Sequence, residues 1–207
     1  MRIGILGSGL MGGKLGTLFA RAGHVVVFSY ARSTEKLKRL AKDAKGNARA
    51  GTPPEAAQNA DALLVAVHWS RIDDVLGETG DLSGKVIVTC SLPMNADNTG
   101  LVIGHTFSGA EALAKKVPKA RVVCAFNTVP SEVLFGVYEA RRKTNRPSLV
   151  CCGDDAHSMG QFLCDRRLGR RRADRFAVRC HDAHCRKAAD TRRGGRSCLC
   201  DADHCSF

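Results

Sequence analysis

The stretch Gly7-Ser8-Gly9-Leu10-Met11-Gly12 decides the fold, and it follows the pattern G-x-G-x-x-G close to the start of the chain. An apolar run, residues 3–6, leads into it, a helical pattern of leucines follows, and a second apolar run begins at Val25. This order of strand, glycine turn, helix and strand is the context in which the pattern indicates dinucleotide binding.

Each part of the turn has a separate task in such a fold. The first glycine permits the tight turn, the second lets the backbone approach a pyrophosphate, and the third allows the helix to pack closely on the sheet. The helix then begins at Leu10 and Met11, whose N–H groups and positive dipole end would face the phosphates. We therefore predict that all six residues of the turn bind a dinucleotide.

The end of the second strand distinguishes between the two nicotinamide dinucleotides. NAD-binding folds place Asp or Glu about 20 residues beyond the glycines to hold the ribose 2′-hydroxyl. Here the segment reads Ser29-Tyr30-Ala31-Arg32-Ser33, and the first acid is Glu35. A hydroxyl and a guanidinium suit a 2′-phosphate, so Ser29, Arg32 and Ser33 predict NADP(H). The alternative is that Arg32 and the lysines after it are only a solvated face.

Four further apolar runs alternate with helical patterns along the chain. The runs are residues 62–67, 86–90, 121–126 and 147–152, and the helical patterns include 34–44, 54–59 and 106–116. This alternation predicts an α/β fold, a Rossmann-type doubly wound parallel sheet with right-handed crossovers. Ligands bind beyond the carboxyl ends of such strands. The candidate cofactor-binding residues there are Val67, His68, Trp69, Ser91, Ala125 and Asn127.

Composition divides the 207 residues into two segments. Ile, Leu and Val number 36 in residues 1–156 but 4 in residues 157–207, which also carry half of the formal net charge of +12. We predict an NADP-binding domain over 1–156 and a basic, disordered or irregular tail over 157–207 that is not an independent domain. The chain shows neither a signal peptide nor the ~18 apolar residues of a membrane span, so we expect a cytoplasmic protein that binds no membrane.

Several segments together resemble one family. They are the glycine turn, the Ser-x-x-Arg after the second strand, residues 104–114 (GHTFSGAEALA), 121–129 (RVVCAFNTV) and 152–155 (CGDD). The chain thus resembles the F420-dependent NADP oxidoreductases and their bacterial NADPH-binding relatives, and its domain resembles the NADPH-binding part of the STEAP metalloreductases. Two positions depart from the family pattern: Leu92, where the family often has Asn, and Cys124, where it often has Lys.

The resemblance implies hydride transfer between NADPH and a small-molecule acceptor such as the deazaflavin F420 or a flavin. The cofactors carry that chemistry, so no acid–base pair is required, and we predict no catalytic side chain. The resemblance favours Asn127 as a residue that orients the nicotinamide or the acceptor. His68 either contacts a ligand or is simply packed at its strand end, and Cys90, Cys124 and Cys151 are expected to be buried apolar fillers.

The tail leaves three interpretations open. Its Cys and His residues are able to hold zinc, but their spacings match no standard site, and its arginines would attract phosphate without reading a nucleic-acid sequence. We favour the third, a reading-frame change near residues 157–160, because 11 of its 12 basic residues are Arg. We therefore predict no metal site and no specific nucleic acid. The lost C-terminal part would leave a homodimer contact and turnover incomplete, and the alternative function is a non-catalytic NADPH-binding module for redox sensing or docking.

Overall fold

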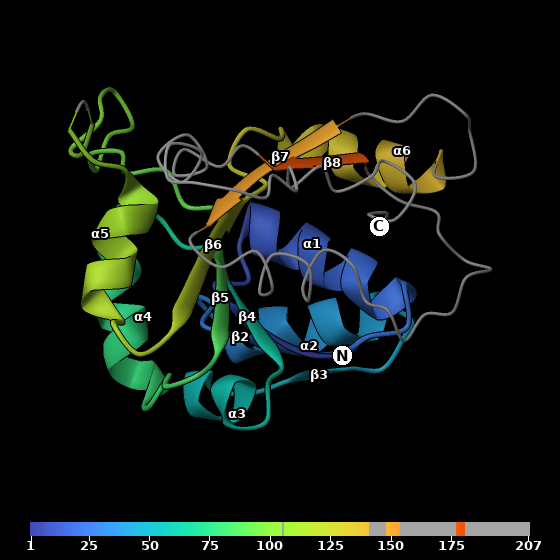
Figure 1. Cartoon of the computed structure of the whole chain (residues 1–207). Helices are drawn as coiled ribbons and strands as arrows, with labels where there is room; N and C mark the ends of the chain where they lie inside the picture. The colour runs from blue at the N-terminus through green and yellow to red at the C-terminus, as the bar shows by residue number, and fades with distance from the viewer. Residues whose placement is uncertain (105, 141–147, 154–176, 181–207) are drawn as a thin grey trace, which may run out of the picture.

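The structure, a computed structural model, describes residues 1–104, 106–140, 148–153 and 177–180. Its centre is a sheet whose strands, within the described residues, lie in the order β3-β2-β1-β4-β5-β6-β7-β8 (Figure 1). The strands are β1 (Arg2–Leu6), β2 (Val25–Ser29), β3 (Ala48–Ala50), β4 (Ala62–Val65), β5 (Val86–Thr89), β6 (Arg121–Ala125), β7 (Ser148–Gly153) and β8 (Ala177–Cys180). The predicted α/β, Rossmann-type fold is confirmed.

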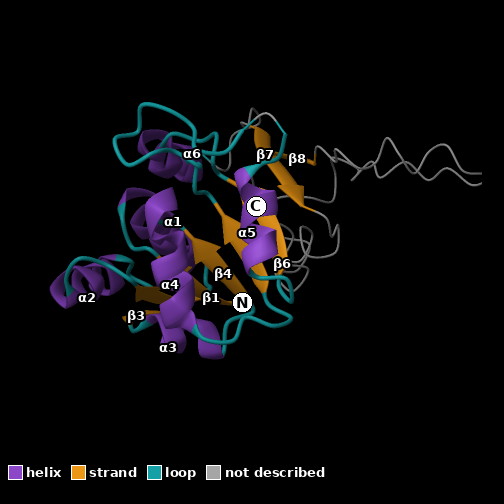
Figure 2. Ribbon diagram, turned by 90° about the vertical axis from the view of Figure 1, so that its left-hand side faces the viewer, coloured by secondary structure: helices purple, strands orange, loops and turns teal. Residues whose placement is uncertain are grey.

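Helices cover both faces of the sheet (Figure 2). One face carries α1 (Leu10–Arg21), α2 (Thr34–Asp43) and α6 (Leu134–Glu139), and the other carries α3 (Pro53–Gln58), α4 (Ile72–Thr79) and α5 (Gly109–Lys116). Two short 3-10 helices, η1 (Trp69–Arg71) and η2 (Ser131–Val133), precede α4 and α6. Because both faces are covered, the central strands are apolar throughout, and all four residues of β4 are buried.

Side-chain caps fix where several helices begin. Ser33 accepts a hydrogen bond from the N–H of Lys36 and caps α2, as its sequence predicts. Thr52 with Glu55, and Ser108 with Glu111, form capping boxes at the starts of α3 and α5. The cap at Ser108 explains why α5 begins at Gly109 and not at residue 106, where the apolar pattern predicts it.

The direction of β7 corrects the prediction of a wholly parallel sheet. The strand pairs from β3 to β6 in the sheet order are all parallel, but β7 runs antiparallel to β6, with Cys152 opposite Cys124. An apolar run predicts a buried strand without giving its direction, which depends on the path of the connecting chain. The antiparallel pair is therefore a tertiary feature that the pattern could not supply.

Three elements escaped the sequence analysis. Strand β3 has only three residues, helix α6 has six, and β8 lies within the tail that we expected to be disordered or irregular. Strand β8 runs parallel to β7, with Ala177 opposite Ser148, so these four residues join the sheet. The rest of the tail, with most of its Cys and His residues, lies outside the described residues.

Candidate dinucleotide-binding site

The glycine turn connects β1 to α1 in the geometry that its sequence predicts. Gly7 has φ +107°, a conformation that side chains other than glycine rarely adopt. Its N–H donates to the carbonyl oxygen of Ser29 at 3.2 Å, and the N–H of Ser8 donates to that of Tyr30 at 3.1 Å. A Cβ added at Gly12 would overlap the carbonyl oxygen of Gly7. The helix therefore packs against the turn at a distance that only glycine allows.

The N-terminus of α1 is left open toward the carboxyl edge of the sheet. Gly9 is its N-cap, and no side chain caps the helix. A Cβ placed on Gly9 would meet no atom within 4 Å, and Leu10 is 63% exposed. The first-turn N–H groups have no partner within the helix itself, so they are suited to phosphate oxygens. The turn thus fits the pyrophosphate of a dinucleotide.

The two serines of this region are enclosed and not open to a ligand. Ser8 and Ser29 are both fully buried. The hydroxyl of Ser29 donates to the carbonyl oxygen of Ile5 at 2.7 Å, and that of Ser8 donates to the carbonyl oxygen of Ser29 at 2.9 Å. The two hydroxyl groups therefore connect β1, β2 and the turn by hydrogen bonds. The Ser29 hydroxyl thus makes its hydrogen bond inside the fold, and its contact with a 2′-phosphate stays a prediction.

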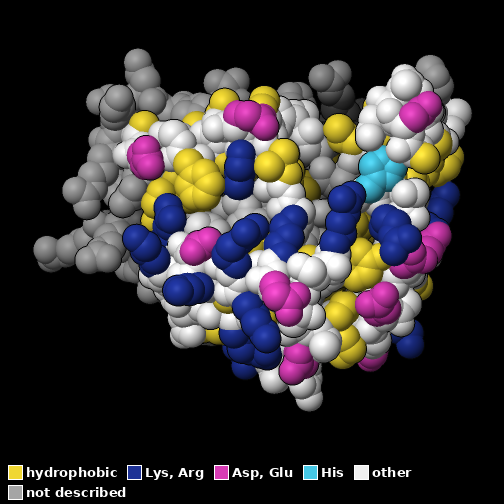
Figure 3. All heavy atoms as spheres, turned by 180° about the vertical axis from the view of Figure 1, so that it is seen from behind, with side chains coloured by type: hydrophobic (Ala, Val, Ile, Leu, Met, Phe, Trp, Pro, Cys, Tyr) yellow, Lys and Arg dark blue, Asp and Glu magenta, His cyan; other side chains and the backbone are white. Residues whose placement is uncertain are grey.

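Arg32 and Ser33 remain exposed after β2. Arg32 has no ion-pair or hydrogen-bond partner among the described residues, and the oxygen of Ser33 caps α2. Helix α2, which begins here, has four Lys or Arg residues against Glu35 and Asp43. Figure 3 shows Lys and Arg side chains spread over one face of the molecule, with acidic side chains among them. The end of β2 therefore offers a free cation next to a basic helix, which favours an anionic group.

A second arginine, Arg71, lies near the same end and was not predicted. Its Nε donates to the hydroxyl oxygen of Tyr30 at 3.2 Å, and its Nη1 lies 3.1 Å from Oδ2 of Asp74. The hydrogen bond with Tyr30 and the charge of Asp74 raise the pKa of Arg71. Tyr30 has φ +54° at the end of β2, whereas Arg71 precedes α4 after β4. Their contact therefore crosses the position of β1, beside the glycine turn.

The ends of β4 and β5 are held together by polar contacts. The Ser91 hydroxyl donates to the carbonyl oxygen of Val67 at 2.7 Å, and Trp69 and Val67 pack against the core. Nδ1 of His68 lies 2.9 Å from Oγ of Ser70, and Nε2 lies 3.1 Å from Oδ1 of Asn98. Both ring nitrogens of His68 thus have partners within the loops, which favours the packed interpretation of this residue.

The end of β6 places one predicted residue inside the fold and another at its surface. Ala125 is fully buried, and its role as a contact residue stays a prediction. Phe126 has φ +64° and packs edge to face on Phe19, with ring centroids 6.4 Å apart. The left-handed backbone turns the chain out of the sheet, and Asn127 follows half-buried. Asn127 therefore lies where the prediction puts it, at the carboxyl end of β6.

Comparison with known proteins agrees with this geometry. Residues 2–93 match the model of the family described as NADP oxidoreductase, coenzyme F420-dependent. Over these residues the chain matches that family, as its motifs predict. The matched part contains the glycine turn, Arg32, Arg71 and Ser91. The match covers 92 of the 207 residues and supports the predicted resemblance to NADP-dependent oxidoreductases over that part, whereas the acceptor stays a prediction.

Several solved structures share the fold of this chain. A protein from Arthrobacter sp. FB24, proposed to be an F420-dependent NADP reductase, is 21% identical with a TM-score of 0.71, over 91% of this chain and 88% of that one. A hypothetical protein from Sinorhizobium meliloti is 23% identical with a TM-score of 0.73, over 88% and 85%. A reductive aminase from Aspergillus terreus in complex with NADPH and ethyl levulinate is 17% identical with a TM-score of 0.58, over 87% of this chain and 54% of that one.

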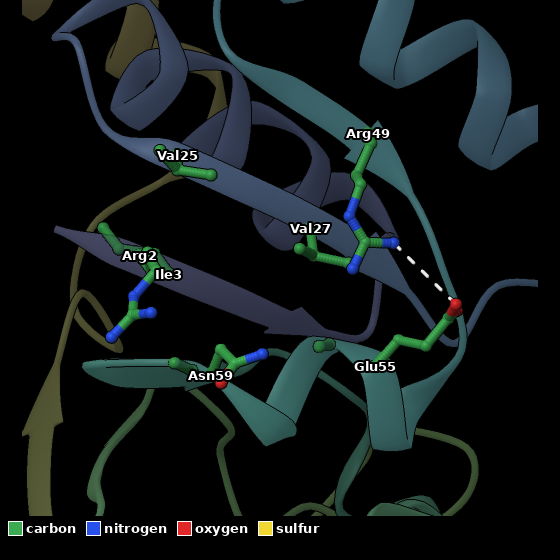
Figure 4. A pocket seen from close by; sticks show the side chains of 9 residues that line it. Arg2, Ile3, Val25, Val27, Arg49, Glu55 and Asn59 are labelled. Atoms are coloured by element: carbon green, nitrogen blue, oxygen red, sulfur yellow. Dashed lines mark ion pairs between the residues drawn. The ribbon is translucent and has the colours of Figure 1, made fainter.

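A cavity of about 230 Å³ lies away from this edge, between β1, β2, β3 and α3 (Figure 4). Arg49 and Glu55 stand on one side of it as an ion pair at 4.0 Å, and its floor is apolar. None of the predicted site residues lines it.

Among the described residues there is also no group of three or more His, Cys, Asp or Glu that could hold a metal, and no helix with the length and apolar character of a membrane span.

Proposed function

We propose that this chain binds NADP(H) along the carboxyl edge of the sheet, from the end of β2 to the ends of β5 and β6. The open N-terminus of α1 carries the proposal, because Gly9 leaves free space over N–H groups that no side chain caps. These groups would receive the pyrophosphate. The adenosine end would lie over β2 and the nicotinamide end toward Ser91 and Asn127.

Recognition of the 2′-phosphate is assigned to Arg32 and Ser33, with Arg71 close by. A guanidinium holds a phosphate through two parallel hydrogen bonds, and an exposed Arg32 is free to turn toward it. No carboxylate stands between Ser29 and Glu35 to select the 2′-hydroxyl of NAD(H). The proposal is therefore NADP(H), not NAD(H).

The proposed reaction is hydride transfer between NADPH and a deazaflavin, a flavin or a similar acceptor. The bound nicotinamide supplies the hydride, and the protein orients it. Asn127 is suited to that task because its amide both donates and accepts hydrogen bonds at the end of β6. His68 holds the neighbouring loops together and is not assigned a proton transfer, since both of its ring nitrogens already have partners.

The second candidate is a non-catalytic NADPH-binding module that senses redox state or docks to a partner. It is favoured by the sequence after residue 155, which departs from the family pattern where further helices would complete the acceptor pocket. Hydride-transfer assays with F420, flavins and ferric chelates separate the two candidates. NADPH binding without turnover on any of these acceptors would favour the module.

Titration of the full chain with NADPH and NADH, followed by nicotinamide fluorescence, tests the binding proposal. We expect the wild type to prefer NADPH and Arg32→Ala to lose about tenfold or more in NADPH affinity with little change for NADH. Arg39→Ala, an exposed arginine further along α2, is the matched control and should leave both affinities unchanged. Equal affinity of the wild type for both cofactors would refute the assignment.

A further inference from the structure

Two cysteines face each other across the antiparallel pair of β6 and β7. Cys124 and Cys152 are directly opposite in the register, and both are thiols. Residues directly opposite in an antiparallel pair have Cα atoms about 4.5–5.5 Å apart and side chains on the same face. A disulfide needs a Cα separation of about 4.4–6.8 Å. The backbone therefore already holds this pair at the distance of a disulfide.

The two thiols differ in their surroundings. Cys124 is 9% exposed, whereas Cys152 is an exposed residue of β7. The side chain of Cys124 is hydrogen-bonded to that of Cys152, and this bond together with burial raises the pKa of the Cys124 thiol. Cys124 therefore keeps its proton more firmly than a solvated thiol would, whereas the side chain of Cys152 is open to solvent. A dissolved molecule therefore reaches the sulfur of Cys152 before that of Cys124.

The neighbouring thiols do not compete for this role. Burial raises the pKa of Cys90 to about 12, so it is protonated at neutral pH. Cys151 is 1% exposed and lies opposite Ala125, and as the neighbour of Cys152 along the strand it points to the other face of the sheet. One exposed and one buried sulfur therefore form a defined pair.

We propose that Cys124 and Cys152 form a dithiol site that reacts with small-molecule disulfides such as oxidised glutathione. The thiolate of Cys152 attacks one sulfur of the disulfide, forming a mixed disulfide and releasing one thiolate. Cys124 then gives its proton to the thiolate released in the first step and attacks the sulfur of Cys152, which forms the cross-strand disulfide and releases the second thiolate. Two protein thiols are oxidised and one disulfide is reduced to two thiols. The inference does not depend on NADP(H) binding.

The test treats the full chain with oxidised glutathione, blocks the remaining thiols and maps the tryptic peptides by mass spectrometry. We expect peptide 122–141, which contains Cys124, to be linked to peptide 144–166, and a thiol reductant to reverse the link. Cys152→Ser should abolish it. Cys151→Ala, the matched control on the adjacent buried residue, should keep it. Cys152 linked instead to another cysteine of the chain, or loss of the link only in Cys151→Ala, would overturn the proposal.

A second variant gives a positive signal that does not depend on the crosslink itself. Cys124→Ser lacks the resolving thiol, so the first step should stop at the mixed disulfide. We expect glutathione retained on Cys152 to rise about tenfold or more over the wild type under the same conditions. A wild type that retains as much glutathione on Cys152 as this variant would contradict the assigned role of Cys124.

Discussion

The two ends of the carboxyl edge of the sheet are built in different ways. At the end formed by β1 and β2, neighbouring strands are parallel, and backbone hydrogen bonds between residues 22 apart in the sequence fix the glycine turn. At the end formed by β6 and β7, the strand direction reverses, Phe126 takes a left-handed backbone, and two thiols stand opposite each other. The first end is specified locally, whereas the second depends on how distant segments pair.

The largest expected effect tests how tightly the first end is packed. Gly12→Ala adds a Cβ that overlaps the backbone carbonyl oxygen of Gly7, so one of the two backbone segments must shift. We expect a loss of about 3 kcal/mol in the free energy of unfolding, measured by urea denaturation. An alanine variant as stable as the wild type would show that the helix and the turn are less closely packed than the contact indicates.

Gly9→Ala is the matched opposite case. Gly9 has φ −79° and ψ −147°, and its added Cβ would meet no atom within 4 Å. The loss of stability should be clearly smaller than in Gly12→Ala, because no atom clashes with the added Cβ. NADPH affinity should fall about tenfold or more, because the methyl group would stand where the pyrophosphate approaches the backbone. Unchanged NADPH affinity in Gly9→Ala would show that the pyrophosphate does not bind at this turn.

These two glycines show what can be predicted from the sequence. Their roles follow from the G-x-G-x-x-G spacing and its flanking strands, because turn, helix and packing are all local. The burial of Ser29 and Ala125 could not be predicted from a local sequence pattern. Each is the last residue of its strand, and only the register of the neighbouring strands decides whether such a side chain faces the core or the ligand edge.

The antiparallel direction of β7 and the contact between Tyr30 and Arg71 escaped prediction for a related reason. Both join segments that are far apart in the sequence, and neither leaves a periodic pattern. The buried state of Cys90, Cys124 and Cys151 was predicted, because an apolar run covered on both faces buries whatever small side chain it contains. That the next residue, Cys152, would lie exposed opposite Cys124 follows only from the pairing.

A smaller effect on NADPH affinity is expected for Arg71, at the end formed by β1 and β2. Its contact with Tyr30 crosses strands, so it can be compared with the locally formed glycine turn. Arg71→Ala should weaken NADPH binding about threefold to tenfold, since the lost cation is exposed and its effect is screened by salt. Tyr30→Phe, which removes only the hydroxyl that holds Nε, should give part of that loss. The two changes combined should cost less than their sum, because they remove one shared contact. Strict additivity in titrations would show that Tyr30 does not position Arg71.

The smallest effect concerns the amino end of the same strands, where Asp61 joins β1 to the start of β4. Its Oδ2 accepts the N–H of Arg2 at 2.7 Å, and its Oδ1 lies 3.4 Å from Nη2 of the same residue. Partial burial alone would raise the pKa of Asp61, but the hydrogen bonds from Arg2 outweigh it and lower the pKa. The stabilisation is therefore complete above the unfolded pKa, about 3.9, and is lost as the pH falls through the lower folded value.

Asp61→Asn should cost under about 1 kcal/mol at pH 7, because the pair is largely solvated. It should also flatten the fall in stability below pH ~4, measured by urea denaturation across that range. An unchanged acid profile in Asp61→Asn would mean that other carboxylates, such as Glu55 in its capping box, account for the acid sensitivity of this end.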